Sequence, residues 1–311
     1  MSKKLLSVIV PVYNEEEVLP ISYARFSEAL SKITDYDYEL IYVDDGSRDR
    51  SLDLLRDFAK NDPRLRVLSF SRNFGHQLAV TAGMDIAKGD AVIIIDVDLQ
   101  DPPEIIAQMV ARWEAGADVV YGKRKKREGE SAFKLVTAFF YYRLLSFMSS
   151  YPIPLDSGDF RLLDRAVAQQ FLTMREHNRF LRGMSAWMGY TAEPLEYARA
   201  EREAGKTKYT LKKMLKLAFD GIAGFSYKPL TLPGYIGAAI CTLSLLGLLA
   251  LIILAAIIGV APWLWALAGI LFVQGIVLVA LGLQGAYLGR MYDELKGRPL
   301  YIVRETIGTD E

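Results

Sequence analysis

Three side chains with oxygen atoms follow a short apolar run near the middle of the amino-terminal half of the chain. Asp96, Asp98 and Gln100 occupy alternate positions directly after the run at residues 92–95. Carboxylate and amide oxygens are hard ligands, suited to Mg²⁺ or Mn²⁺ ions that bridge phosphate groups. The spacing therefore predicts a divalent metal site. Taken alone, the Asp-x-Asp pattern fits a solvated acidic turn after a strand equally well.

The elements that must position these side chains alternate between strand and helix patterns over roughly the first 125 residues. The run at 92–95 is short and β-branched, which predicts a buried strand of a parallel sheet. Alternating units of this kind imply a parallel sheet with helices on both faces, whose ligands bind at the carboxyl ends of the strands. Further strands are predicted at 6–10, 39–43, 66–69 and 118–121, and helices at 15–33, 51–60, 77–87 and 103–115.

Two other polar segments follow predicted strands. Residues 11–15 (PVYNE) come after the first strand, and residues 44–47 (DDGS) come after the second. Both are expected at the same sheet edge as Asp96 and Asp98. Asp44 can accept a hydrogen bond from a base or a ribose hydroxyl, as acidic residues after strands do in nucleotide-binding folds. Each segment alone is also good turn sequence, so the predicted nucleotide site rests on their coincidence.

The composition excludes several classes of protein. The 37 basic and 37 acidic side chains cancel, so bulk charge indicates no nucleic-acid partner. A single cysteine, Cys241, excludes a disulfide framework and a cysteine-rich metal site. The chain has only two histidines, His76 and His177, so we do not expect a zinc site built from several histidines.

The charges are unevenly distributed along the chain. Residues 229–289 contain no Asp, Glu, Lys or Arg, and this stretch is long enough for two membrane helices of about 20 residues each. Spans are predicted at 235–258 and 263–287, with a turn at 259–262. Basic residues flank the pair and none lies in the turn, which predicts that both termini are cytoplasmic. The alternative is a buried helical hairpin of a soluble protein.

Two segments are expected at the membrane surface. In residues 207–222, apolar side chains recur at helical spacing, and Lys208, Lys212 and Lys216 occupy another face. A basic amphipathic helix before a membrane span is typical of an interfacial helix, although an ordinary core helix with a charged face has the same pattern. Residues 131–150 are apolar and rich in aromatic side chains, which fits an interfacial helix or a core helix.

Together these segments resemble the motifs of family-2 glycosyltransferases with the GT-A fold. More narrowly, the chain resembles polyprenyl-phosphate glycosyltransferases, which include dolichol-phosphate mannose synthase and bacterial undecaprenyl-phosphate glucosyltransferases of the GtrB type. The resemblance covers nearly the whole chain. The matching segments are PVYNE at 11–15, VDDGS at 43–47, GDAVIIIDVDLQDPP at 89–103 and SGDFRL at 157–162.

The resemblance implies an α/β fold: a Rossmann-like, mostly parallel GT-A sheet followed by interfacial amphipathic helices and two transmembrane helices. The stripe formed by Gly282, Gly285 and Gly289 leaves room for close helix packing, so the sequence allows a homo-oligomer without deciding the oligomeric state. The implied parts are a GT-A domain at 1–205 that includes the segment 131–150, an interfacial helix at 206–228, a transmembrane hairpin at 232–289 and a cytoplasmic tail at 290–311.

The resemblance also implies roles for single residues. Those that would hold the nucleotide are Pro11, Tyr13, Glu15, Asp44 and Asp96. Those that would bind the divalent metal, Mg²⁺ or Mn²⁺, are Asp96, Asp98 and Gln100. Those that would contact donor or acceptor phosphates are Arg124, Lys206 and Lys208. Those that would act on the transferred sugar as catalytic residues are Asp156, Asp159 and Arg161.

The implied reaction is inverting transfer of a hexose from a nucleotide-sugar to polyprenyl phosphate at the cytoplasmic face of the bacterial inner membrane. Glucose from UDP-glucose is the expected donor, with N-acetylglucosamine, mannose and 4-amino-4-deoxy-arabinose donors still open. The lipid phosphate has a second pKa of about 6 and is anionic at neutral pH, so no strong general base is required. Two alternatives are a processive family-2 polysaccharide synthase, which would normally carry a Q-x-x-R-W motif that this chain lacks, and a non-catalytic membrane scaffold that binds sugar nucleotides.

Overall fold

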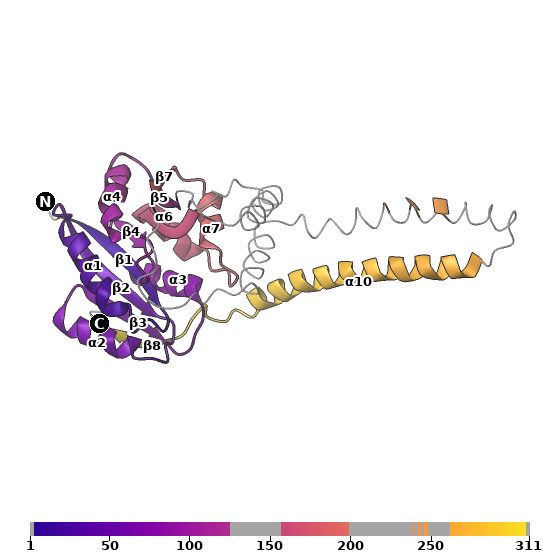
Figure 1. Ribbon diagram of the computed structural model, residues 1–311, viewed down its shortest axis with the longest axis horizontal. Helices are drawn as coiled ribbons and strands as arrows, with labels where there is room; N and C mark the ends of the chain where they lie inside the picture. Colours follow the sequence, from indigo (N-terminus) through magenta and orange to yellow (C-terminus); the bar gives the residue numbers. More distant parts are fainter. Residues whose placement is uncertain are drawn as a thin grey trace.

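A computed structural model of the 311-residue chain describes residues 3–124, 157–198, 239, 242–243, 246–247 and 262–308. Figure 1 shows an α/β body at one end and a long helix, α10 (Pro262–Leu295), that projects away from it. The predicted interfacial segments at 131–150 and 206–228 lie outside the described residues, as do the site residues Asp156, Lys206 and Lys208.

Within the described residues, the body is built on one eight-stranded sheet with the order β7-β5-β6-β4-β1-β2-β3-β8. The central strands β4, β1, β2 and β3 pair in parallel, and every described strand except β6 and β8 runs in the same direction. The prediction of an α/β fold with a mostly parallel sheet is therefore confirmed. The strands are β1 Lys4–Val12, β2 Tyr36–Asp44, β3 Leu65–Phe70, β4 Ala91–Ile94, β5 Val119–Arg124, β6 Ser157–Asp164, β7 Ala192–Tyr197 and β8 Val303–Ile307.

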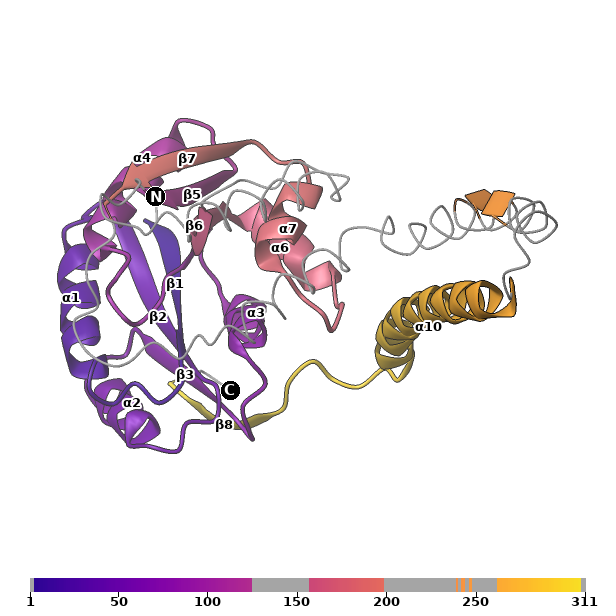
Figure 2. The same ribbon diagram turned by 45° about the vertical axis from the view of Figure 1, so that its right-hand side comes forward.

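Helices cover both faces of the sheet, because the strands are apolar on both sides. The helices are α1 Leu19–Ser31, α2 Ser51–Asn61, α3 His76–Ile86, α4 Ile106–Glu114 after a short 3-10 turn at Pro103–Ile105, α6 Arg165–Thr173 and α7 Leu181–Trp187. One apolar core joins α1, α2 and α4 to the sheet, and a second core joins α3, α6 and α7 to the opposite face. Figure 2 shows α1 and α2 on one side of β1, β2 and β3, with α3 on the other.

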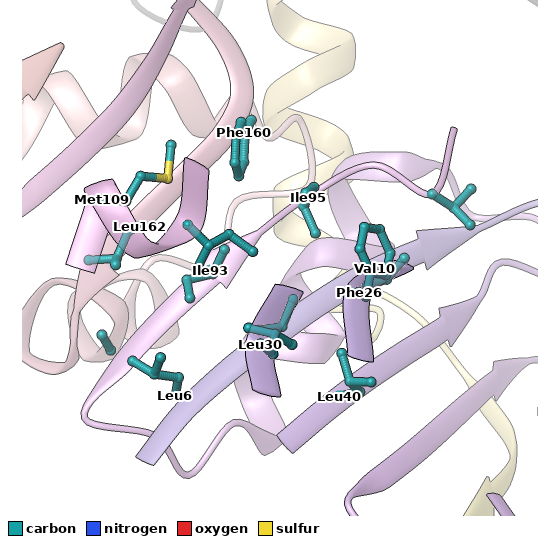
Figure 3. Packing of buried hydrophobic residues seen from close by; sticks show 14 of the residues in the cluster. Leu6, Val10, Phe26, Leu30, Leu40, Ile93, Ile95, Met109, Phe160 and Leu162 are labelled. Carbon is teal, nitrogen blue, oxygen red and sulfur yellow. The ribbon is translucent and has the colours of Figure 1, made fainter. Parts of the chain in front are cut away.

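Packing in the first core fixes the carboxyl ends of the central strands. Phe26 and Leu30 of α1 are fully buried with Val10 of β1 and Leu40 of β2 (Figure 3). Burying each such side chain contributes about 1.5–3 kcal/mol relative to leaving it in water. This packing holds α1 against β1 and β2, the strands whose carboxyl ends carry the first two polar loops.

The position of strand β6 differs from the simple βα alternation predicted from the sequence. It lies between β4 and β5 and is antiparallel to both, so β5 is not the direct neighbour of β4. Local periodicity indicates that a segment is extended but does not say which strand it pairs with. The insertion matters for the site because β6 carries the SGDFRL segment to the edge where β4 ends.

The carboxyl-terminal residues, which lie in the segment predicted as a cytoplasmic tail at 290–311, add a strand to the sheet. Strand β8 pairs antiparallel with β3 and covers the edge of the sheet. Just before β8, the ring of Tyr301 stacks on Phe70 at a centroid distance of 5.0 Å, and its hydroxyl donates to Asp85 Oδ2 at 2.5 Å. Arg56 of α2 makes a forked ion pair with Glu305 of β8. Strand β3 is therefore paired on both sides, and β8 is the edge strand at this end of the sheet.

Helix α10 is 34 residues long and overlaps the second predicted span at 263–287. Its carboxyl end contacts the α/β body, because both the backbone N–H and the ring of His177 bond to Glu294. Among the residues that the structure describes, no helix combines the length and the apolar composition needed to cross a membrane.

Candidate active site

The loops after β1 and β2 are joined by hydrogen bonds. Asn14 N–H donates to Ser47 Oγ at 2.9 Å, and Arg48 N–H donates to Asn14 Oδ1 at 2.7 Å. The backbone of Asn14 adopts a positive φ of 53°, which asparagine tolerates better than most residues. The PVYNE and DDGS segments therefore form one surface at the end of the sheet.

The predicted nucleotide-binding residues lie on or beside this surface. Pro11 is buried in β1, whereas Tyr13 and Glu15 are partly exposed. Asp44 is buried at the end of β2, where its carboxylate accepts from Ser47 N–H at 3.0 Å and from Ser69 Oγ at 2.8 Å. These bonds fix the Asp44 carboxylate and leave further lone pairs, because an ionised carboxylate has about four acceptor sites.

Asp45 has a different task from its neighbour. Its buried carboxylate accepts from Phe74 N–H at 2.6 Å, Gly75 N–H at 2.9 Å and Asn73 Nδ2 at 2.7 Å. Burial raises the pKa of Asp45 to about 6, although the bonds from Phe74 and Gly75 oppose the shift. Asp45 therefore holds the loop between β3 and α3 against the DDGS turn, which the sequence did not indicate.

The loop between β3 and α3 positions His76 at the site. His76 is the first residue of α3, and its Nε2 lies 3.6 Å from Asp96 Oδ1 and 3.7 Å from Asp159 Oδ2. The sequence alone predicts no role for this histidine. The position of His76 after β3 could have identified it as a site residue, because the carboxyl end of β3 lies at the same sheet edge as those of β1, β2 and β4.

The predicted metal ligands follow β4 in a tight loop. Asp98 is buried, Asp96 and Gln100 are partly exposed, and Gln100 N–H donates to Asp98 Oδ1 at 3.2 Å. Leu99 adopts a positive φ of 57° while fully buried. Strain of this kind persists only where packing holds it, and it clusters at ligand sites.

The negative charge at this edge is concentrated. Burial, together with the negative charges of Asp101, Asp159 and Asp98, raises the pKa of Asp96 to about 6, while His76 opposes the shift. A divalent cation would offset this repulsion. Within the described residues, no group of three or more His, Cys, Asp or Glu side chains forms a metal site alone. Two carboxylates still fit Mg²⁺, which is usually held by one or two carboxylates together with substrate phosphates.

Asp159 reaches the same place from β6. Arg182 of α7 forms a forked ion pair with it, with Nε 2.8 Å from Oδ1 and Nη2 3.2 Å from Oδ2. Burial opposes ionisation, but Arg182, with help from His76 and Arg161, lowers the pKa of Asp159 well below its ordinary value. Asp159 is therefore a firmly ionised acceptor beside Asp96.

Arg161 supports the site from within the protein. Its side chain is buried and donates to the backbone carbonyls of Gly158, Asp159 and Leu181. Burial lowers its pKa to about 10. The predicted catalytic residue Arg161 thus braces the backbone of β6 against the start of α7. Arg124 is the last residue of β5, whose carboxyl end lies at the same edge of the sheet.

A family model described as glycosyl transferase family 2 matches residues 7–172, more than half of the chain. The chain belongs to glycosyl transferase family 2. The match to the family spans the four strand ends described above together with Asp159. Arg182 lies beyond it.

Relatives of this family 2 glycosyltransferase match along nearly the whole chain. An uncharacterised glycosyltransferase of Bacillus subtilis is 48% identical over 306 residues, which cover 98% of this chain and 94% of the relative. One from Synechocystis is 42% identical over 309 residues, covering 98% and 96%. A prophage-derived bactoprenol glucosyl transferase of Shigella flexneri is 40% identical over 303 residues, covering 97% and 98%.

Proposed function

We propose that this glycosyltransferase transfers glucose from UDP-glucose to undecaprenyl phosphate or a similar polyprenyl phosphate. The observation that carries the proposal is the juxtaposition of the joined 11–15 and 44–47 loops with the carboxylates Asp96, Asp98 and Asp159 at one sheet edge. Relatives named bactoprenol glucosyl transferase support the choice of sugar and of lipid acceptor.

The joined loops would hold the nucleotide. Asp44 is fixed where it can accept from the ribose or the base, and Tyr13 and Glu15 are accessible beside it. Asp96 and Asp98, with Gln100, would hold a Mg²⁺ or Mn²⁺ ion on the diphosphate. When bound, the cation neutralises charge that develops on the leaving nucleoside diphosphate.

The acceptor supplies its own nucleophile. A bond forms between an anionic oxygen of the lipid phosphate and the anomeric carbon of glucose, while the bond from that carbon to the nucleoside diphosphate breaks. This single displacement inverts the sugar, so an α-linked donor gives a β-linked product. Asp159 does not need to remove a proton, and its ionised carboxylate is suited to accept a hydrogen bond from a sugar hydroxyl.

We place the protein in the bacterial inner membrane with the α/β body in the cytoplasm. Support comes from the uncharged stretch at 229–289 and from large apolar side chains that are exposed along α10. Exposed apolar surface of this extent is typical of contact with lipid or protein. The side chains are Trp263, Leu267, Ile270, Val277, Val279, Leu281 and Leu288.

The test is a panel of nucleotide sugars incubated with the purified full chain, undecaprenyl phosphate and Mg²⁺ or Mn²⁺, with the lipid product identified by mass. We expect one hexose per lipid from UDP-glucose, and at least about a hundredfold less product from Asp98→Ala because the developing charge is then poorly neutralised. If no donor in the panel releases its nucleoside diphosphate, the result favours a non-catalytic binding scaffold. Long saccharide chains would favour a processive synthase.

A further inference from the structure

Two basic side chains approach Asp159 from different helices. Arg182 of α7 contacts both carboxylate oxygens, at 2.8 and 3.2 Å, and His76 at the start of α3 lies 3.7 Å from Oδ2. Arg182 is about a quarter exposed and Asp159 less so, which places the pair at the rim of the site.

The two helices are also tied to each other. Gln77, the residue after His76, accepts a hydrogen bond through its side-chain Oε1 from Leu181 N–H at 2.9 Å. Leu181 precedes Arg182 and also accepts from the buried Arg161 through its carbonyl. The starts of α3 and α7 are therefore held in a fixed relation on either side of Asp159.

A forked arginine restricts a carboxylate more than a single contact does. Two parallel N–H···O bonds define the plane of the carboxylate as well as its position. Oxygens oriented in this way present their remaining lone pairs in a defined direction. His76 Nε2 lies 3.7 Å from Asp159 Oδ2 and 3.6 Å from Asp96 Oδ1, so the oriented carboxylate stands beside the proposed donor end of the site.

We propose that Arg182 is a positioning residue for the transferred sugar: it holds the Asp159 carboxylate in the one orientation in which Asp159 accepts from a sugar hydroxyl. This inference rests on the proposed function, since it needs a sugar to be present between Asp159 and the donor phosphates. The competing interpretation is an ion pair that only fastens α7 to β6.

A double-mutant cycle separates these interpretations. We expect Arg182→Gln and Asp159→Asn each to lower kcat by about a hundredfold, the scale expected when a reacting group is misplaced by about 1 Å. The KM for the donor should change by less than about threefold, because neither residue lies on the nucleotide loops. If Arg182 affects the reaction through that carboxylate, the double variant should be no slower than Asp159→Asn.

Conservative and control variants complete the design. Arg182→Lys keeps the charge without the fork and should give an intermediate kcat; it replaces Arg182→Gln in the cycle if the latter does not fold. Arg64→Gln removes another forked arginine–carboxylate pair, with Asp62, just before the amino end of β3 and so at the opposite edge of the sheet, and should keep wild-type kcat. Binding of UDP with Mn²⁺, measured by calorimetry, should be the same in the Arg182 variants and the wild type.

Several outcomes would overturn the inference. Effects that multiply in the double variant, an unchanged kcat in Arg182→Gln, or loss of UDP and Mn²⁺ binding would each contradict a role through Asp159. Failure of the proposed function looks different, because the wild type itself would then transfer no sugar to the lipid. If the wild type uses another sugar nucleotide, the same cycle is measured with that donor.

Discussion

At the scale of single residues, the adjacent aspartates Asp44 and Asp45 have different roles. Asp44 is fixed at the ligand edge by Ser47 and Ser69, whereas Asp45 is turned inward to hold the loop that precedes His76. Gly46 makes this arrangement feasible, because a Cβ there would lie 2.5 Å from the carbonyl carbon of Arg72. The DDGS segment therefore contributes Asp44 to the ligand edge and, through Asp45, also holds the loop that precedes His76.

Replacing Gly46 with alanine is expected to destabilise the protein more than the same change at Gly189. Both residues have positive φ, 69° and 74°, which costs an L side chain roughly 1–2 kcal/mol. Only Gly46 adds a backbone clash, since a Cβ at Gly189 would meet no atom of the described residues within 4 Å. Thermal unfolding of both variants and the wild type measures the difference. Equal shifts would contradict a close approach of the Gly46 and Arg72 backbones.

At the scale of elements, the carboxyl-terminal end of α10 and strand β8 are parts of the catalytic body. His177 explains how the end of α10 is held: Nδ1 lies 2.9 Å from Glu294 Oε2 and Nε2 lies 2.9 Å from the Arg298 carbonyl. Both ring nitrogens face acceptors, so the doubly protonated cation satisfies both. The bond to Glu294 and the Arg298 carbonyl therefore raise the pKa of His177, while burial opposes them.

This contact is expected to weaken as pH rises. A raised histidine pKa contributes stability that is fully present below the unfolded value, near 6.5, and is lost as pH rises through the higher folded value. The side chains of His177 and Glu294 are 25% and 41% exposed, so the effect is about 0.2–1 kcal/mol. The thermal midpoint of His177→Gln should fall below that of the wild type at pH 6, and the gap should close by about pH 9. A gap independent of pH would exclude the charged contact.

At the scale of the whole molecule, the chain leaves the sheet after β7 and returns to it at β8 by way of α10 (Figure 1). The segment between these strands thus begins and ends on the same α/β body. If the segment enters the membrane as a hairpin, both of its ends must lie on the side of the membrane where the body lies. This connectivity agrees with the orientation that we propose from the flanking basic residues.

The proposed orientation can be measured by cysteine labelling, because Cys241 is the only cysteine. In a Cys241→Ser background, Gly259→Cys in the predicted turn should react with a membrane-impermeant maleimide added to intact spheroplasts. Lys60→Cys on α2, a position exposed in the body, should react only after lysis. The opposite pattern, or recovery of the protein in the soluble fraction, would refute the proposed topology.

The sequence by itself determined the α/β class, most of the strands and helices, the polar segments at the strand ends and the uncharged stretch. These depend on periodicity, turn chemistry and charge within a few residues of each other. Asp96 and Asp98 were predicted together because they are neighbours on one short loop. Asp44 and the 11–15 loop were expected near these two residues because the carboxyl ends of parallel strands lie at the same edge of the sheet.

Only the tertiary structure decided which distant segments meet. The placement of β6 between β4 and β5, of β8 beside β3, and of His76 and Arg182 around Asp159 depends on contacts between residues far apart in the chain. Nothing local distinguishes Arg182 from an exposed arginine on a short helix. Its role follows from the packing of α7 against β6, because a strong charge pair forms only where folding brings two side chains to hydrogen-bonding distance.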